Sequence, residues 1–145
     1  MTSHDEENIV SQMTQDSSTL SGCDYCWPAS AEDAWHARRD LRELARWVDE
    51  SHFNVRGLQC VHCSSKFISV FSESIDWING DDAQSWTTAP VTADEFARVE
   101  ALVPSSIEAA LCAVPAQRRS LRREYPAGGD ARVNWTSGIA VGGHD

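Results

Sequence analysis

The spacing of the cysteines constrains this chain more than any other feature. The segments "GCDYCWPAS" and "LQCVHCSSKF" each contain two cysteines separated by two residues, Cys23 with Cys26 and Cys60 with Cys63. Two thiolates at this spacing can share one tight turn and point at one ion about 2.3 Å away. Two such turns complete a tetrahedron with no open coordination position. The pattern therefore predicts one structural zinc ion, which would stabilise the fold and activate no water.

The cysteines are also compatible with two alternative roles. A Cys-x-x-Cys before a helix is typical of thiol redox proteins, and Cys26 precedes a predicted helix whose N-terminus would stabilise a thiolate. Inert packing in the core is the second alternative. His36, His52 and His62 are left outside the predicted ligand set, because four thiolates need no substitution. The fifth cysteine, Cys112, is predicted to be a buried small apolar residue.

The two motifs resemble the zinc-ribbon and treble-clef class, in which two cysteine knuckles grip one ion. The closer match is "CVHCSSKF", where an aromatic residue follows four positions after the second cysteine. The chain differs from that class in two respects: neither knuckle has glycine directly after its second cysteine, and the segment between the knuckles is predicted to be helical rather than a β-hairpin. The resemblance implies a metal and no particular role. We expect Trp27 to shield the metal, and Lys66 and Arg56 to offset the charge of the sulfurs.

Charge and composition narrow the class of partner. The formal net charge is −10, from 22 acidic and 12 basic residues. This balance opposes non-specific attraction to nucleic acid or to an anionic membrane, and favours a basic protein partner. We expect no membrane segment and no export signal, and five cysteines in such a chain fit a reducing compartment, so the predicted location is the cytoplasm. The sequence lacks the motifs of the common catalytic classes, which favours a protein without enzymatic activity.

The expected organisation is one domain between two less ordered segments. The polar residues 1–22 are predicted to be a disordered tail. Residues 23–125 are predicted to form a zinc-stabilised α+β domain, with amphipathic helices packed on a short antiparallel sheet. Residues 126–145 are glycine-rich and are expected to be partly ordered.

Periodicity predicts the elements of the first half of this domain. Apolar residues recur at helical spacing in "SAEDAWHARRDLRELARWVDESHF", which predicts one amphipathic helix over 31–51. Alternation after the second knuckle predicts a strand over 67–76. Asn79-Gly80 is a hairpin turn signal, so a return strand is expected over about 83–88.

Capping patterns predict helices in the second half. Thr92 and Glu95 have the spacing of a capping box, and Ser105 with Glu108 repeats it. The segment "QRRSLRREY" is expected to add one or two further helical turns.

Three groups of residues are candidate binding surfaces. Trp35 and Trp47 lie on the flanks of the predicted first helix and are candidate anchors for a partner. Asp81 and Asp82 surround the hairpin turn, where they would either stabilise the turn or contact a basic partner. The basic cluster, which would pair on a helix as a phosphate grip or be solvated, consists of Arg118, Arg119, Arg122 and Arg123.

The leading hypothesis is a zinc-stabilised interaction module without catalytic activity, which binds a protein with a basic surface. An acidic inhibitor or immunity-type protein is one concrete form. The first alternative is a nucleic-acid-associated or transcription-accessory zinc protein that uses the arginines at 118–123. The second alternative is a Cys-x-x-Cys redox protein.

Overall fold

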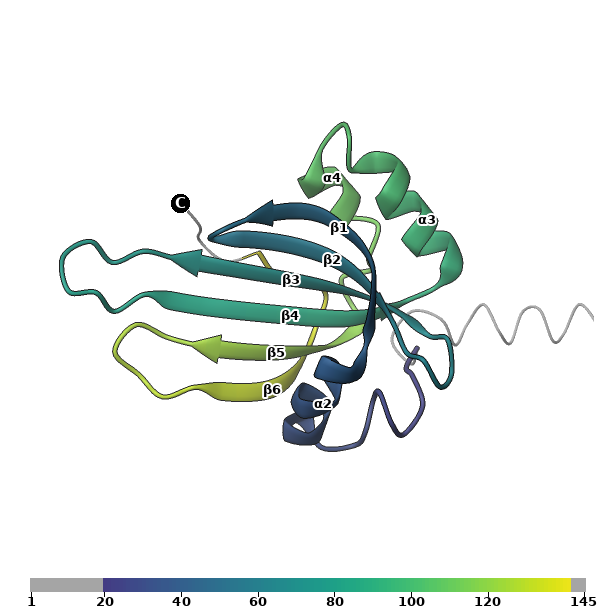
Figure 1. Cartoon of the computed structure of the whole chain (residues 1–145), viewed down its shortest axis with the longest axis horizontal. Coiled ribbons are helices and arrows are strands. Elements are labelled where there is room, and N and C mark those ends of the chain that lie inside the picture. Colours follow the sequence, from purple (N-terminus) through teal and green to yellow (C-terminus); the bar gives the residue numbers. More distant parts are fainter. Residues whose placement is uncertain (1–19, 142–145) are drawn as a thin grey trace, which may run out of the picture.

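The chain forms one six-stranded antiparallel sheet, in which every strand pairs with the strands before and after it in sequence. The computed structural model describes residues 20–141, so most of the tail predicted over 1–22 lies outside the described residues. The strands are β1 (Arg42–Glu50), β2 (Phe53–Gln59), β3 (Lys66–Ser74), β4 (Ala83–Val91), β5 (Arg119–Tyr125) and β6 (Arg132–Ser137). Figure 1 shows the resulting curved meander, with the long β3–β4 and β5–β6 hairpins projecting at the same end.

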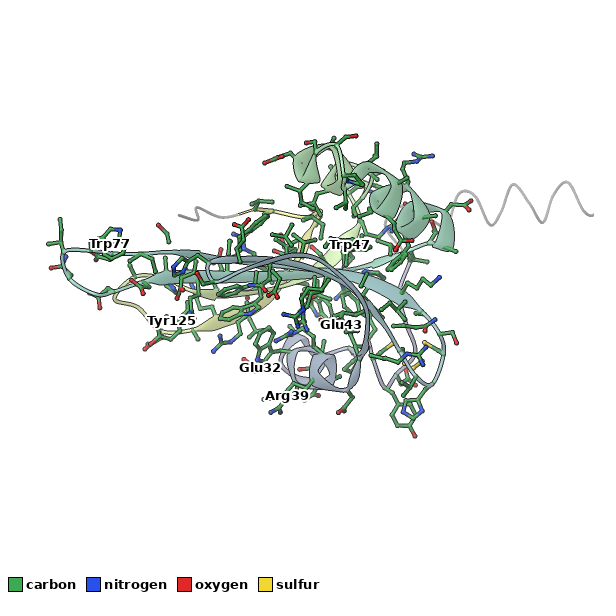
Figure 2. All side chains as sticks on the ribbon, turned by 45° about the horizontal axis from the view of Figure 1, so that its top comes forward. Glu32, Arg39, Glu43, Trp47, Trp77 and Tyr125 are labelled. Atoms are coloured by element: carbon green, nitrogen blue, oxygen red, sulfur yellow. The ribbon has the colours of Figure 1, made fainter. Side chains whose placement is uncertain are left out.

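Short helices cover the two faces of this sheet. A helix α2 (Ala31–Ala37) and a 3₁₀ turn η1 (Arg38–Asp40) precede β1, whereas α3 (Ala93–Leu102) and α4 (Ile107–Leu111) lie between β4 and β5. Figure 2 shows α3 and α4 on one face of the sheet and α2 on the opposite face. Within residues 20–141 no helix has both the length and the apolar character needed to cross a membrane.

The predicted architecture of helices on a short hairpin is therefore wrong, and the largest error is the helix over 31–51. The helix ends at Ala37, and the charged segment that follows is the edge strand β1, paired with β2 along its length. The register shifts between Glu43 and Ala45 and again between Arg46 and Val48. These two irregularities remove the two-residue alternation by which a strand is recognised, so the residues mimic a helical stripe.

The segment "QRRSLRREY" is also a strand rather than a helix. Its residues form β5, which pairs with β4 on one side and β6 on the other. Ser120 and Leu121 are both buried there although they point to opposite faces, because the sheet lies between two layers of side chains. Pairing on both edges overrides the helix propensity of the arginines. β6 lies beyond residue 125, so part of the glycine-rich C-terminal segment belongs to the same sheet.

Several local predictions are confirmed. The strand β3 occupies most of 67–76, and Gly80 has a positive φ of 72° in the turn that follows. The return strand is longer than predicted and continues to Val91. Thr92 and Glu95 form the predicted capping box at α3. The α4 cap is displaced by one residue, because Ser106 rather than Ser105 accepts the bond from the third residue of the helix.

The main core lies between the sheet and the helices α3 and α4. It is built from side chains of β2, β3, β4, both helices and the loop that follows them. Its buried members are Phe53, Val55, Ile68, Val70, Ala89, Val91, Phe96, Val99, Ala110, Leu111 and Val114. None of the cysteines belongs to this core, and Cys26 and Cys60 lie in a second, smaller apolar cluster.

Candidate metal centre

The four cysteines of the two predicted knuckles converge on one point. Cys23 Sγ lies 3.8 Å from both Cys26 Sγ and Cys60 Sγ, and Cys26 Sγ lies 3.7 Å from Cys63 Sγ. All four sulfurs lie within 4.8 Å of one another. The predicted convergence is confirmed: residues far apart in sequence form a group that could hold one metal ion.

The second knuckle is the turn of the β2–β3 hairpin. Ser64 N–H donates to Cys60 O at 3.0 Å, and Cys60 N–H donates to Ser65 O at 2.9 Å. Ser64, directly after Cys63, has a positive φ of 65°. It therefore adopts the left-handed conformation for which glycine is favoured at this position. The backbone N–H of His62 donates to Cys60 Sγ at 3.3 Å, a contact that holds the sulfur toward the centre.

The first knuckle is a tight turn in the loop before α2. Trp27 N–H donates to Cys23 O at 2.8 Å, which closes the turn around the first two cysteines. Ser30 then caps α2 by accepting from Asp33 N–H at 3.3 Å. Glycine is required at position 22, because a Cβ there would collide with Cys26 Sγ and would lie 3.2 Å from the Phe67 ring.

An apolar cluster encloses the inner side of the sulfurs. Leu58 and Phe67 are buried with Cys26 and Cys60, and Trp27 packs against this cluster, 5.4 Å from Phe67 between ring centroids. The outer side is more open. The Tyr25 ring stacks on the His62 ring with centroids 4.4 Å apart, so an aromatic pair also connects the two knuckles.

Without a metal ion, the four cysteines do not all favour the thiolate form. Burial is the largest cause that raises the pKa of the Cys26 thiol far above its ordinary value, and hydrogen bonding with the neighbouring Cys60 sulfur adds to it. Burial also tends to raise the pKa of the Cys63 thiol, but hydrogen bonds from Ser65 outweigh this effect and lower that pKa to about 6. The bare site thus does not favour four thiolates, whereas a bound divalent ion compensates their charge.

Two residues expected to offset the charge of the sulfurs have contacts elsewhere, and the fifth cysteine is not buried. Lys66 Nζ lies over the Phe96 ring at 5.1 Å from its centroid, and Arg56 Nη1 pairs with Glu43 at 3.4 Å. Cys112 is exposed, so its predicted burial is wrong. It follows Leu111 at the end of α4, where the buried side of the helix has just ended.

The predicted partner anchors are packed within the molecule. Trp35 lies 5.5 Å from Trp86 between ring centroids, and Trp47 lies 5.2 Å from Phe96. Both are partly buried. Figure 2 shows Trp47 near the sheet on the side of α3, whereas Trp77 lies at the far end of the β3–β4 hairpin.

The most exposed aromatic residue within residues 20–141 is one that the sequence pattern did not single out. Trp77 is 84 % exposed and the adjacent Ile78 is 91 % exposed. Their position directly before the Asn79-Gly80 turn was the available signal, since residues at a turn tip have no strand partner to cover them.

The predicted arginine cluster is divided. Arg118 is buried and bonds to Glu95, while Arg122 pairs with Glu124 at 2.8 Å. Arg119 lies over Trp135 at 4.3 Å, and Arg123 lies over Trp35 and Trp86. The helical pairing that would have formed a phosphate grip does not exist, because successive residues of β5 alternate between the two faces of the sheet.

No protein-family model, curated protein or solved structure matches this chain. The zinc-ribbon resemblance therefore rests on the two knuckles alone, and function has to be argued from the sites that the chain itself presents.

Proposed function

We propose that this chain is a zinc-stabilised interaction module that binds a basic protein partner and has no catalytic activity of its own. The sulfur geometry supports zinc as the ion. A tetrahedral ion with metal–sulfur bonds of about 2.3 Å requires sulfur–sulfur edges of about 3.8 Å. The closest sulfur pairs lie at 3.7–3.8 Å, and four soft thiolates are a donor set that zinc prefers. Four protein ligands leave no open position, which supports a structural ion.

The tip of the β3–β4 hairpin is the observation that carries the interaction proposal. Trp77 and Ile78 are the two most exposed large apolar side chains within residues 20–141. The turn presents them in a defined shape: Asp76 Oδ1 accepts from Ile78 N–H and Asn79 N–H, both at 3.0 Å. Asp82 Oδ1 accepts from Asp76 N–H at 2.8 Å. An exposed tryptophan on a preformed turn is a suitable anchor for a partner's apolar pocket.

Acidic groups surround this tip on the side of the β5–β6 hairpin. A hollow of about 480 Å³ lies between the two hairpin ends, and its carboxylates are those of Glu73, Asp81, Asp82 and Asp130. A partner with a basic rim around an apolar pocket would match both features, and the chain's net charge of −10 would accelerate its approach. An inhibitor or immunity-type protein is the form of this function that such a surface fits.

The experiment is affinity capture from cells of the source organism with three forms of the tagged chain. The tip variant carries Trp77→Ser and Ile78→Ser, and the matched control carries Leu44→Ser, an exposed apolar residue on β1. We expect wild type and Leu44→Ser to capture one basic protein that the tip variant loses, with recovery falling as salt is raised. That protein is then purified and its affinity for the three forms measured directly. A partner retained by the tip variant, or no protein distinguished by the three forms, contradicts the proposal.

Metal analysis tests the zinc component separately. We expect purified wild type and Cys112→Ser to contain one zinc per chain, and Cys60→Ser to contain much less. A protein that is metal-free when isolated under reducing conditions, and whose cysteines give up two electrons to an added oxidant as a disulfide forms and regain them when a reductant is added, would be a dithiol redox protein instead.

A further inference from the structure

One face of the sheet carries arginine and aromatic side chains that neither the metal centre nor the hairpin tip uses. It is the face on the side of α2. In the register of the sheet, Arg46 of β1 lies opposite Arg56 of β2, and Arg56 lies opposite Ser69 of β3. In the adjacent row, Phe71 of β3 lies opposite Trp86 of β4. Four neighbouring strands thus bring these side chains onto one surface.

These residues surround a hollow. Its volume is about 240 Å³, and we call it the arginine–aromatic hollow; it is lined by Arg46, Asn54, Arg56, Ser69, Phe71 and Trp86. The Phe71 and Trp86 rings form its aromatic side, with centroids 4.9 Å apart. Both rings are partly exposed, as are the guanidinium groups of Arg56 and Arg46, with 28 % and 42 % of the side chain accessible.

Two more arginines border the aromatic side of the hollow. Arg123 Cζ lies 5.0 Å from the Trp86 ring and 4.9 Å from the Trp35 ring. Arg38 Cζ lies over the Trp35 ring, 4.1 Å from its centroid. The Nε of Arg38 is buried and has no hydrogen-bond partner among the described residues. Burial, followed by the positive charges of Arg56, Arg123 and Arg39, lowers the pKa of Arg38 to about 10.

The acidic groups beside these arginines do not balance them. Arg46 pairs with Glu43 at 2.9 Å and with Asp49 at 3.1 Å, and Arg56 shares the same Glu43 oxygen at 3.4 Å. No ion pair of Arg38 or Arg123 occurs in the described part of the chain. The four guanidinium groups therefore have only two carboxylate partners among the described residues, those of Glu43 and Asp49, on a protein whose overall charge is −10. Positive charges held together against the charge of the whole chain indicate a local need for an anion.

We propose that the arginine–aromatic hollow binds a planar ring that carries a phosphate group, with the ring against Phe71 and Trp86 and the phosphate at Arg46 and Arg56. Guanidinium forks match phosphate oxygens, and partly exposed aromatic rings at the side of a basic groove are suited to stacking a base. The chemistry is that of a nucleotide, whether free or within a single strand. This binding does not depend on the partner proposed for the hairpin tip, which lies at the turn of the β3–β4 hairpin.

Calorimetric titration of the metal-loaded full chain tests the proposal. The probes are adenosine 5′-monophosphate, adenosine, inorganic phosphate and a short single-stranded oligothymidylate. The variants are Arg56→Gln, which removes one fork, and Phe71→Leu, which removes one ring but keeps an apolar side chain. The matched control is Arg98→Gln, an exposed arginine on α3 and so on the opposite face of the sheet. Metal content and thermal unfolding establish that each variant is folded.

We expect the nucleotide to bind with a dissociation constant below about 1 mM, and adenosine and phosphate to bind at least about tenfold more weakly. Arg56→Gln should weaken nucleotide binding about tenfold or more, and Phe71→Leu should also weaken it, while Arg98→Gln should leave it unchanged. Tighter binding of the oligothymidylate than of the nucleotide would show that the hollow binds nucleotides within a single strand rather than free nucleotides. Equal binding of phosphate and nucleotide, equal losses in Arg56→Gln and Arg98→Gln, or the absence of saturable binding by every probe would overturn the proposal.

Discussion

Arg118 and Glu95 form a two-hydrogen-bond ion pair that joins the residue directly before β5 to the first turn of α3. Arg118 Nη1 lies 2.7 Å from Glu95 Oε1, and Nη2 lies 2.8 Å from Oε2. The Arg118 side chain is 1 % exposed and also donates to Pro90 O at 2.8 Å. Glu95 Oε1 accepts from Thr92 N–H at 2.8 Å as well, so one carboxylate both caps α3 and attaches it to the sheet.

Removing either partner of this pair should strongly destabilise the fold. Glu95→Gln keeps a side chain that can complete the capping box, but it removes the carboxylate charge that pairs with the buried Arg118. We expect it to lower the free energy of unfolding by about 3–5 kcal/mol, measured by urea denaturation. The control Glu100→Gln, at an exposed position of the same helix, should change it by less than about 0.5 kcal/mol. The double variant Arg118→Met, Glu95→Gln should recover part of the loss, and equal effects of Glu95→Gln and Glu100→Gln would contradict this account.

The same ion pair should make the free energy of unfolding decrease at low pH. Burial opposes ionisation of Glu95, but hydrogen bonds from Arg118 and Thr92 outweigh it and lower the pKa of this carboxyl below its ordinary value of 4.5. A group whose pKa is lower in the folded state contributes stability above its unfolded pKa, and that contribution disappears as pH falls through the folded pKa. We therefore expect stability to decline below about pH 4.5. In urea unfolding at several pH values, Glu95→Gln should show a shallower decline than wild type, and parallel curves would contradict the assignment.

The metal ligands could be predicted from the sequence because their signal is local. Each knuckle encodes its own turn, and two identical spacings imply one shared ion whatever the intervening chain does. The structure of that intervening chain could not be predicted in the same way. β1 has helix-forming residues and two irregularities in its pairing with β2, so its strand character comes only from its neighbour. β5 likewise depends on β4 and β6.

The binding surfaces also could not be predicted from local sequence, because they depend on contacts between separate elements. Helical periodicity places Trp35 and Trp47 on the flanks of one helix, but they lie on a helix and a strand and pack against Trp86 and Phe96. The arginine–aromatic hollow is assembled from side chains of four strands, so no contiguous segment contains it. Its residues could be recognised as a group only when the register of the sheet was known.

Substitution at Gly22 should damage the metal centre without removing a ligand. A methyl group at this position would collide with Cys26 Sγ, and it would also lie 3.2 Å from the buried Phe67 ring. We expect Gly22→Ala to cost about 1–3 kcal/mol of unfolding free energy and to weaken metal retention during chelator titration. Ser21→Ala, at the exposed neighbouring position, is the control and should behave as wild type. Normal metal retention in Gly22→Ala would show that the first knuckle can shift.

Replacing Ser64 with glycine should increase the free energy of unfolding, in contrast to the substitution at Gly22. The left-handed conformation costs a non-glycine residue about 1–2 kcal/mol, and the greater entropy of glycine in the unfolded chain offsets part of the gain. We expect Ser64→Gly to stabilise the metal-loaded protein by about 0.5–1 kcal/mol in urea unfolding. Ser65→Gly should instead destabilise it, because Ser65 Oγ lies 3.2 Å from Cys63 Sγ and this contact would be lost. A loss of stability in Ser64→Gly would mean that the serine side chain has a role that its backbone conformation does not reveal.

Removing the metal should open the knuckles and leave the sheet folded. Eleven buried residues form the core beneath α3 and α4, whereas four form the cluster around the sulfurs. The sheet is thus stabilised mainly by burial that does not involve the metal, and local opening requires less energy than global unfolding. After chelation under reducing conditions, we expect hydrogen exchange to show lost protection at residues 20–30 and 59–66. Amides at Ile68, Val70 and Ala89 should remain protected, and restoring zinc should restore protection in both knuckle segments. Loss of protection throughout β3 and β4 on chelation would show instead that the whole domain folds only with its metal.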